Sequence, residues 1–455
     1  MARRIWSVLS LAVCTLLLIA CSGDDYLNAI PRESTALMAI DVGEVARERG
    51  MANQEQVLRE LLQVDDVADC GIDLGNKIYL FETVEGDFGL CAKVKSQGDL
   101  EKWVHQLARK GLCRELTERK GYHFTLLNDA WLVGFSEETM MVMGPIVIDA
   151  QVERQQRMSR YLGNSEEEGV KSSPLFKRLD TIQAPMAMVA RAHALPDDLA
   201  APFTLGAPKG ADASQVVIEA RMDIDQGWLN IEGKTFSFNK EVDASLKAAA
   251  GVFRPIGDSY VASMSSDALM GMFVNVVGKQ FLPLLQGNEA LQVLLTGINT
   301  AVDMDNIIRS VDGDMLITIR SFSEEDLHLV MAAKLAHSQW LSDVGYWKQS
   351  CPEGSRIIDC GKDSYCFTNG HTSFFFGVSD DMQFYGGSDE PSARAAILPA
   401  ARPLAEGLRQ RVIGKKMVLV LNLEKVGQQQ EEVSALTGML KPFFGDLKAI
   451  VFSLR

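Results

Sequence analysis

Part of this sequence occurs twice. The dipeptide Phe-Thr at Phe124 recurs at Phe367, and the segment Gly-Phe-Ser-Glu-Glu from Gly134 recurs as Gly-Val-Ser-Asp-Asp from Gly377, so that both offsets are 243 residues. Self-similarity that keeps its order along the chain is the signature of a duplicated structural unit. We therefore predict a tandem duplication. Its two halves are expected at residues 26–250 and 251–455.

Two further blocks extend the repeat at other offsets. The segment Ala-Lys-Val at Ala92 compares with Ala-Lys-Leu at Ala333. Nearer the N-terminus, residues 30–40 compare with residues 254–264, and each of these segments leads from a proline into a short apolar run. Because the offsets differ, we expect insertions between the blocks.

Each half is predicted to be an α+β unit with a mainly antiparallel sheet covered by helices. Runs rich in β-branched and aromatic residues predict strands, and apolar residues at helical spacing, such as Leu100, Val104 and Leu107, predict helices between them. Helices are expected at 44–63 and 148–161. Strands are expected at 36–42, 77–83, 88–94, 122–127, 131–135, 187–192, 215–223 and 228–238, and in the second half at 260–264, 315–322, 327–335 and 448–454.

The second half contains a long apolar segment at residues 268–285, which predicts a helix buried on all sides. Asn275, Lys279 and Pro283 argue against a membrane span. Such a helix packs between the two halves, against a partner, or in an ordinary core. The side chains expected in this contact are Met264, Met270, Met272 and Phe273.

The second half ends before it supplies a counterpart to the strand at 228–238. Either its sheet has one strand fewer, or the first half lends one. An uncovered sheet edge accepts a strand from another chain, whereas a helix or side chains over the edge would prevent this.

The N-terminus has the pattern of a secretory signal. Two arginines precede an apolar run that is too short for a comfortable membrane span, and the sequence Leu-Ile-Ala-Cys ends at Cys21. This ending resembles a lipobox, whose cysteine receives a diacylglycerol. We predict a signal peptide at 1–20, a lipidated tether at 21–30, and a mature protein that is held to a membrane by the lipid on Cys21.

The charge of the chain argues against nucleic acid as a partner. The formal net charge is −15, and the sequence has no cluster of lysines and arginines. Such clusters are what bind nucleic acid and anionic lipid headgroups.

Six cysteines remain when Cys14 in the signal and Cys21 are set aside. Three fall in each half, so complete pairing would need a bridge between the halves. If Cys360 pairs with Tyr365 across a hairpin, its thiol and that of Cys366 point to opposite faces and should not bridge. The wide spacing also argues against zinc. We expect at least some free, buried thiols among Cys70, Cys91, Cys113, Cys351, Cys360 and Cys366.

The sequence lacks the familiar motifs of catalysis and cofactor binding, including the glycine-rich phosphate loop, the nucleophile elbow and the paired-histidine metal helix. Ser237 and Lys240 form one Ser-x-x-Lys, but at the end of an expected strand. Acidic residues near Asp65, Asp303 and Asp312 are interpreted as helix caps and turns. No catalytic, cofactor-binding or metal-ligating residue is predicted. The histidines expected to lie at the surface or in the core are His105, His123, His193, His328, His337 and His371.

A short motif follows the tether. The chain reads Tyr-Leu-Asn-Ala-Ile-Pro from Tyr26 to Pro31 and continues into the strand expected at 36–42. With its lipobox and its length, the sequence resembles an uncharacterised family of lipoproteins, a domain of unknown function, from Bacteroides-type bacteria. The resemblance implies a cell-envelope location at the outer membrane, with surface exposure as a further alternative. It assigns no activity and no functional residues.

Two classes of function remain. The first, which the absence of motifs favours, is a non-enzymatic protein that has a structural role or binds an envelope protein, peptide or glycan. The second is a hydrolase of envelope glycans or peptides, with an active site that the halves assemble from distant residues.

Overall fold

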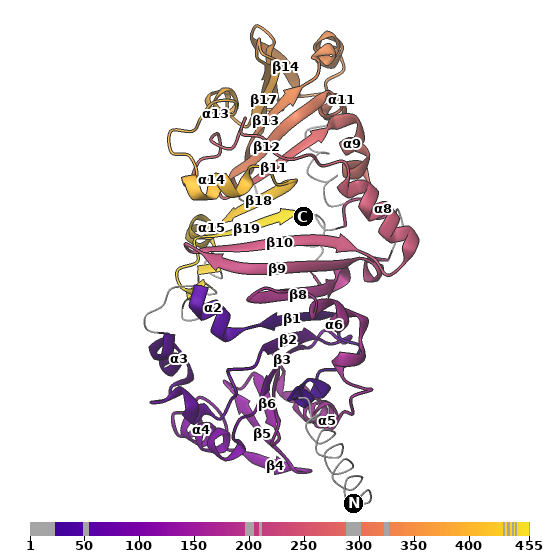
Figure 1. The fold of residues 1–455 in the computed structure, drawn as a ribbon. Helices are drawn as coiled ribbons and strands as arrows, with labels where there is room; N and C mark the ends of the chain where they lie inside the picture. The colour runs from indigo at the N-terminus through magenta and orange to yellow at the C-terminus, as the bar shows by residue number, and fades with distance from the viewer. Residues whose placement is uncertain are drawn as a thin grey trace, which may run out of the picture. The chain divides into compact units, whose positions relative to one another are not determined.

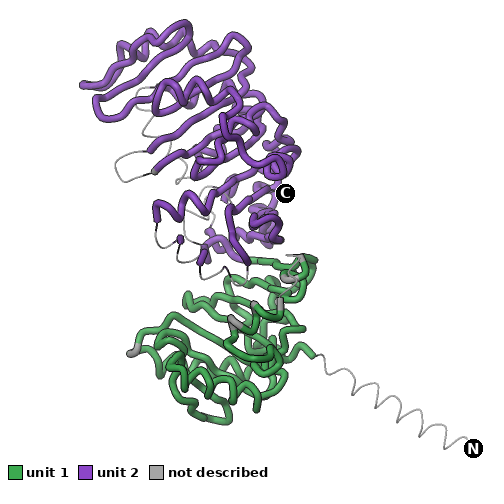
Figure 2. Tube along the Cα trace, turned by 90° about the vertical axis from the view of Figure 1, so that its left-hand side faces the viewer, with its two compact units in different colours: residues 1–189 green, residues 190–455 purple. Residues whose placement is uncertain are grey.

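The computed structural model describes residues 23–48, 54–195, 204–208, 212–287, 302–322, 327–430 and 444–454, with a few more between 433 and 441. The predicted signal peptide and Cys21 lie outside the described residues. The chain forms two compact units, residues 1–189 and 190–455 (Figure 2). Among the helices that the structure describes, none combines the length and the apolar composition that a membrane crossing requires.

The first unit is a mixed α+β structure (Figure 1). Its strands are β1 (Ala36–Ile40), β2 (Ile78–Glu82), β3 (Phe88–Lys93), β4 (Thr117–Arg119), β5 (Tyr122–Leu127), β6 (Trp131–Phe135), β7 (Thr139–Gly144) and β8 (Met186–Arg191). Its helices are α2 (Val42–Glu48), α3 (Gln54–Leu62), α4 (Gln97–Arg109), α5 (Gln151–Leu162) and α6 (Pro174–Leu179), with a 3-10 turn η1 (Asp25–Ala29). The strands pair in the order β4-β5-β6-β7-β3-β2-β1, all antiparallel, and β1 also pairs with β8.

Helices cover both faces of this sheet. Helix α4 begins at Ser96, whose hydroxyl accepts the Asp99 N–H as an N-cap. Its buried stripe packs with Phe135 of β6 in one core. On the opposite face, Met158 of α5 lies so close to Gly134 that a Cβ at Gly134 would overlap its sulfur. The sheet is thus enclosed between two helical layers.

The second unit is also a mixed α+β structure. Its strands are β9 (Val217–Asp225), β10 (Trp228–Phe236), β11 (Met270–Val277), β12 (Val311–Phe322), β13 (Leu327–Leu335), β14 (Arg356–Gly361), β15 (Ser364–Thr368), β16 (Ser373–Val378), β17 (Gln383–Gly387), β18 (Met417–Asn422) and β19 (Ala449–Leu454). Its helices are α8 (Lys240–Ala250), α9 (Gly278–Gln286), α11 (Met304–Arg309), α12 (Val344–Gln349), α13 (Glu390–Ala395), α14 (Glu406–Val412) and α15 (Leu423–Gln429), with a 3-10 turn η8 (Gln339–Asp343). The strand order is β14-β15-β16-β17-β13-β12-β11-β18-β19-β10-β9.

The apolar run at 268–285, predicted as one helix, is strand β11 followed by helix α9. Phe273 packs into the core on one face of the sheet, whereas Val274 and Val276 pack into the core on the other. A strand that is covered on both faces has a continuous apolar sequence, so periodicity does not distinguish it from a buried helix. The strand predicted at 260–264 is a series of turns. Met264 and Phe273 lie in the ordinary core of this unit.

The sheet edge for which the second half supplies no strand, at the C-terminal strand, has a neighbouring strand. Strand β19 pairs in parallel with β10, from Trp228 opposite Ala449 to Gly233 opposite Leu454, and antiparallel with β18. Strand β10, which lies within the predicted first half, therefore supplies the strand that the second half lacks. Because β19 has a neighbour on each side, it has no free edge to which another chain could add a strand. This is the one parallel pair among the pairings whose register the structure gives.

The sequence patterns missed several strands, among them β4, β7, β17 and β18. Strands β7 and β17 each join a hairpin to the centre of their sheet. Their sequences, Thr-Met-Met-Val-Met-Gly and Gln-Phe-Tyr-Gly-Gly, end in glycine and do not alternate between apolar and polar residues. The local pattern is therefore a weak signal, and pairing with their neighbours decides the conformation.

Candidate functional site

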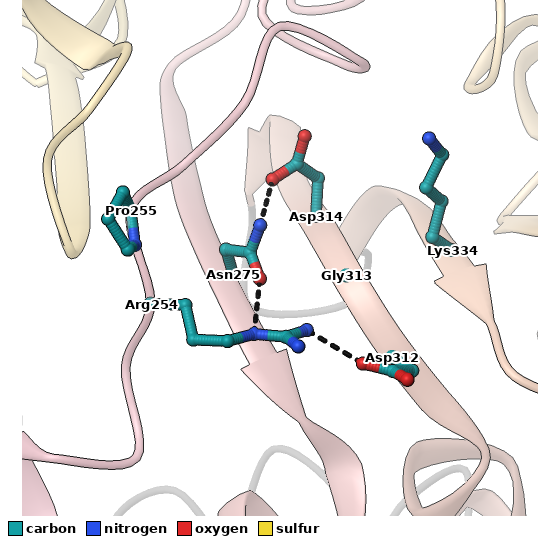
Figure 3. Close-up of a pocket in the computed structure, with 7 residues that line it drawn as sticks. All are labelled: Arg254, Pro255, Asn275, Asp312, Gly313, Asp314 and Lys334. Atoms are coloured by element: carbon teal, nitrogen blue, oxygen red, sulfur yellow. Dashed lines mark hydrogen bonds and ion pairs between the residues drawn. The ribbon is translucent and has the colours of Figure 1, made fainter.

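The second unit has an open pocket of about 430 Å³ beside neighbouring strands β11, β12 and β13 (Figure 3). Each strand contributes polar residues to a sequence that is otherwise apolar, and a segment between α8 and β11 closes one side. The residues that line the pocket are Arg254, Pro255, Asn275, Asp312, Gly313, Asp314 and Lys334.

Asp314 anchors the back of the pocket. Its carboxylate is buried and accepts hydrogen bonds from Asn275 Nδ2 at 2.7 Å, from the Gly257 N–H at 2.9 Å and from the Ser259 N–H at 3.4 Å. A Cβ at Gly257 would lie 2.7 Å from Asp314 Oδ2, so a glycine is needed for this approach. The carboxylate thus ties the segment after Pro255 to the sheet.

Arg254 is the second anchored group. Its Nε donates to Asn275 Oδ1 at 2.8 Å and its Nη2 to the Val276 carbonyl at 3.0 Å. Nη2 also forms an ion pair of 2.8 Å with Asp312, where both side chains are more than two-fifths exposed. Solvent screening limits such a pair to about 1 kcal/mol or less. Asn275 therefore bridges the arginine and the buried carboxylate.

Lys334 differs from these groups. Its side chain is exposed, and in the described part of the chain it makes no hydrogen bond or ion pair; Figure 3 shows it apart from the bonded network. Its stem packs against Gly313, where a Cβ would lie 2.8 Å from Lys334 Cβ. Its charge helps to lower the pKa of Asp381, but no close ion pair holds it. The pocket thus presents one exposed ammonium in front of a fixed polar network. This arrangement suits recognition of an anionic or hydrogen-bonding group.

Comparison with known proteins gives the family. The profile of the family described as "Domain of unknown function (DUF4836)" matches residues 26–399, which is more than half of the chain. The chain belongs to the DUF4836 family. The match begins at Tyr26, the first residue of the motif that suggested an uncharacterised family. No curated protein and no solved structure matches the chain significantly.

Most polar motifs of this DUF4836 chain have local structural roles. The Ser237 hydroxyl donates to the Gln215 carbonyl at 2.6 Å, and Asn239 caps helix α8, which begins at Lys240. Asp303 caps α11, as expected. The Asp312 to Asp314 segment was expected to be a turn, but it lies in β12, because it pairs with the end of β11.

The histidines do not form a common centre in the structure. His123 stacks on Phe135 with ring centroids 5.2 Å apart and lies 3.5 Å from Glu101. His105 lies 3.7 Å from Glu115. Within the described ranges, no group of three or more histidine, cysteine or acidic side chains has an arrangement that would hold a metal ion.

The six cysteines in the part of the DUF4836 chain that the structure describes are free thiols. Cys70 and Cys91 are buried in the first unit, and burial raises the pKa of both thiols. Burial also raises the pKa of Cys360 and Cys366, and each of these two thiols shifts the pKa of the other.

Sequence reasoning did not identify the pocket. Asn275 was considered only as an argument against a membrane span, and Lys334 only as part of the repeat. Asn275 and Lys334 could have been noticed because each is a polar residue within a strongly apolar run. A polar side chain in such a run needs a hydrogen-bonding partner or contact with solvent. That signal does not reveal which strands are neighbours.

Proposed function

We propose that this DUF4836 protein is a lipid-anchored binding protein of the bacterial cell envelope, and that its second unit recognises an anionic group on an envelope peptide or glycan. The observation that supports this most directly is the exposed Lys334 ammonium, which makes no hydrogen bond or close ion pair among the described residues and lies before a network of paired groups. A cation in this position attracts a carboxylate, and the pocket walls restrict its approach.

The bonding of the other pocket residues favours binding over catalysis. A general acid or base must exchange a proton with the substrate, and a nucleophile needs an adjacent base. Asp314 is already held by three donors, and Asp312 is paired with Arg254. The lining residues include no serine, cysteine or histidine. The hydrolase alternative has no specific observation in its favour.

Binding is tested with the anchor residue replaced, Cys21→Ser, so that the chain can be purified without lipid. Acidic peptides and uronate-containing oligosaccharides are titrated into the protein by calorimetry. We expect a Lys334→Ala variant to lose affinity about tenfold, because one charge-assisted hydrogen bond is worth about 1.5 kcal/mol.

The matched control is Lys247→Ala, which removes an exposed lysine of α8 in the same unit. It should bind like the parent protein. Equal affinity of all three proteins, or no binding of any of these ligands, would contradict the proposed site.

The anchor is a separate proposal, since Cys21 lies outside the described residues. It is supported by the signal pattern that precedes Cys21. Replacing Cys21 with serine should move the protein from the membrane fraction to the soluble fraction of cells. Protease treatment of intact cells then distinguishes a surface location from one inside the envelope.

We also propose that the chain arose by tandem duplication. Strands β1 to β7 have the neighbour order β1-β2-β3-β7-β6-β5-β4, and β11 to β17 have the corresponding order β11-β12-β13-β17-β16-β15-β14. Two loop contacts also correspond. The Arg32 N–H donates to the Glu168 carbonyl, as the Ser266 N–H does to the Arg402 carbonyl, with both residues offset by 234.

The same offset relates Tyr26 to Tyr260, and both tyrosines are buried. From the sequence, residues 30–40 were matched with residues 254–264, at an offset of 224. The structural correspondence moves this match by ten residues, so that residues 30–40 correspond to residues 264–274. An experimental structure tests the duplication. Superposing β1–β7 on β11–β17 should place Tyr26 on Tyr260, and a superposition that requires another register would refute it.

A further inference from the structure

The β14–β15 hairpin of the second unit has a register shift at a cysteine. Asp359 pairs with Tyr365, but the next pair is Gly361 with Ser364. Cys360 is therefore an extra residue without a direct partner on β15, as in a β-bulge.

The register of the hairpin places Cys360 near Cys366. Had Cys360 paired with Tyr365, the two thiols would have pointed to opposite faces. The structure corrects that expectation: Asp359 pairs with Tyr365 and Ile358 with Cys366, so Cys360 lies on the same face as Cys366, and each thiol shifts the pKa of the other. Tyr365 points to the other face, where its ring centroid lies 5.6 Å from that of Phe376 in the core.

Helix α13 braces the hairpin at this point. Arg394 Nη2 donates to the Cys360 carbonyl and to Ser364 Oγ, each at 3.1 Å, and Arg394 Nε pairs with Glu390 at 2.9 Å. Cys366 is buried, whereas Cys360 is partly exposed. One sulfur of the pair is therefore accessible from solvent and the other lies behind it.

Contact with a backbone carbonyl does not distinguish the thiols. Cys91 Sγ contacts the Tyr26 carbonyl, Cys113 Sγ the Val104 carbonyl and Cys366 Sγ the Phe367 carbonyl, each at 3.4 Å. Cys360 and Cys366 differ from the others because a second thiol is among the groups that shift the pKa of each.

We propose that Cys360 and Cys366 form a reversible disulfide that locks the bulged end of the β14–β15 hairpin. The Cys360 thiolate attacks one sulfur of a disulfide oxidant, whose S–S bond breaks and releases one thiol. Cys366 Sγ then displaces the second oxidant thiol as the Cys360–Cys366 bond forms. Two electrons and two protons pass from the protein thiols to the oxidant, which leaves as two thiols.

This inference does not depend on the proposed ligand. Export through the predicted signal would place the pair in a compartment in which disulfides persist. Closure would join β14, which pairs only with β15 among the described strands, covalently to its neighbour.

The test uses the full chain in its native state, equilibrated with mixtures of oxidised and reduced glutathione, alkylated and digested with trypsin. Lys362 lies between the two cysteines, so trypsin separates them into peptides 357–362 and 363–394. In the oxidised protein we expect these peptides to remain joined, about 2 Da lighter than the two reduced peptides together, and to separate on reduction. Cys70 and Cys91 should stay reduced.

Two single variants separate the roles of the sulfurs. Cys366→Ser should accumulate a glutathione adduct on Cys360, whereas Cys360→Ser should leave Cys366 unmodified because it is buried. The proposal is overturned if peptides 357–362 and 363–394 do not join at any glutathione ratio. It is also overturned if the wild-type protein carries a glutathione adduct on Cys360 while Cys366 stays reduced. The digest of the wild-type protein tests the disulfide even if one of the variants does not fold.

Discussion

Asn275 Nδ2 donates to Asp314 Oδ1 at 2.7 Å, and these residues face one another on β11 and β12. The same carboxylate accepts the backbone N–H groups of Gly257 and Ser259. One buried side chain therefore fixes the segment that leads to Tyr260 against two strands.

These hydrogen bonds make Asp314 more important for stability than the nearby Asp312. Asp314→Ala should lower the free energy of unfolding by about 2–4 kcal/mol, because it leaves buried donors without an acceptor. The matched change Asp312→Ala removes only a screened ion pair and should cost about 1 kcal/mol or less. Urea denaturation of both variants measures the difference. Equal losses would show that the Asp314 network does not hold the segment.

The two buried tyrosines of the proposed repeat should respond differently to loss of the hydroxyl. Tyr26 Oη donates to the Lys77 carbonyl at 2.9 Å, so Tyr26→Phe should cost about 1 kcal/mol. The Tyr260 hydroxyl is buried and has no partner among the described residues. Tyr260→Phe should leave stability unchanged or raise it by about 1 kcal/mol. A larger loss for Tyr260→Phe than for Tyr26→Phe in thermal or urea unfolding would disprove this reading.

Close packing gives a third comparison, in the first unit. Gly89 lies opposite Phe81, and a Cβ at Gly89 would overlap the buried ring. Gly89→Ala should therefore destabilise the protein by about 1–3 kcal/mol. Gly98, in the first turn of α4, faces open space, and Gly98→Ala should stabilise by up to about 1 kcal/mol. If both substitutions shift the urea midpoint in the same direction, the result would contradict the close packing of the Phe81 ring against Gly89.

Alkaline pH should destabilise the fold. Burial raises the pKa of Tyr26, Tyr79 and Tyr260 and raises that of Cys366 to about 11. The unfolded chain therefore releases protons at lower pH than the folded chain. The stabilising contribution is complete below the unfolded thiol pKa, near 9, and is lost as the pH rises through the folded values.

The measurement is urea unfolding between pH 8 and 11. Stability should fall steadily above pH 9, and Tyr79→Phe should reduce the slope above pH 10. A free energy of unfolding that does not change over this range would contradict the burial of these groups.

Local signals in the sequence predicted several elements closely. Strands β5 and β6 have the predicted bounds, and α4 buries Leu100, Val104 and Leu107 as predicted. The resemblance to an uncharacterised family, drawn from the lipobox, the length and the motif that begins at Tyr26, agrees with the family match. These features depend on residues that are neighbours along the chain, so period and capping are sufficient to reveal them.

The tertiary structure decided the rest. Whether the apolar run at 268–285 formed a strand depended on cores on both faces, and one of the two partners of β19 is a strand more than 200 residues away in sequence. The Asn275–Asp314 contact and the placement of Cys360 on the same face as Cys366 arise from strand pairing and its register. Pairing between distant segments is selected by the free energy of the whole packed sheet, which no local pattern of residues contains.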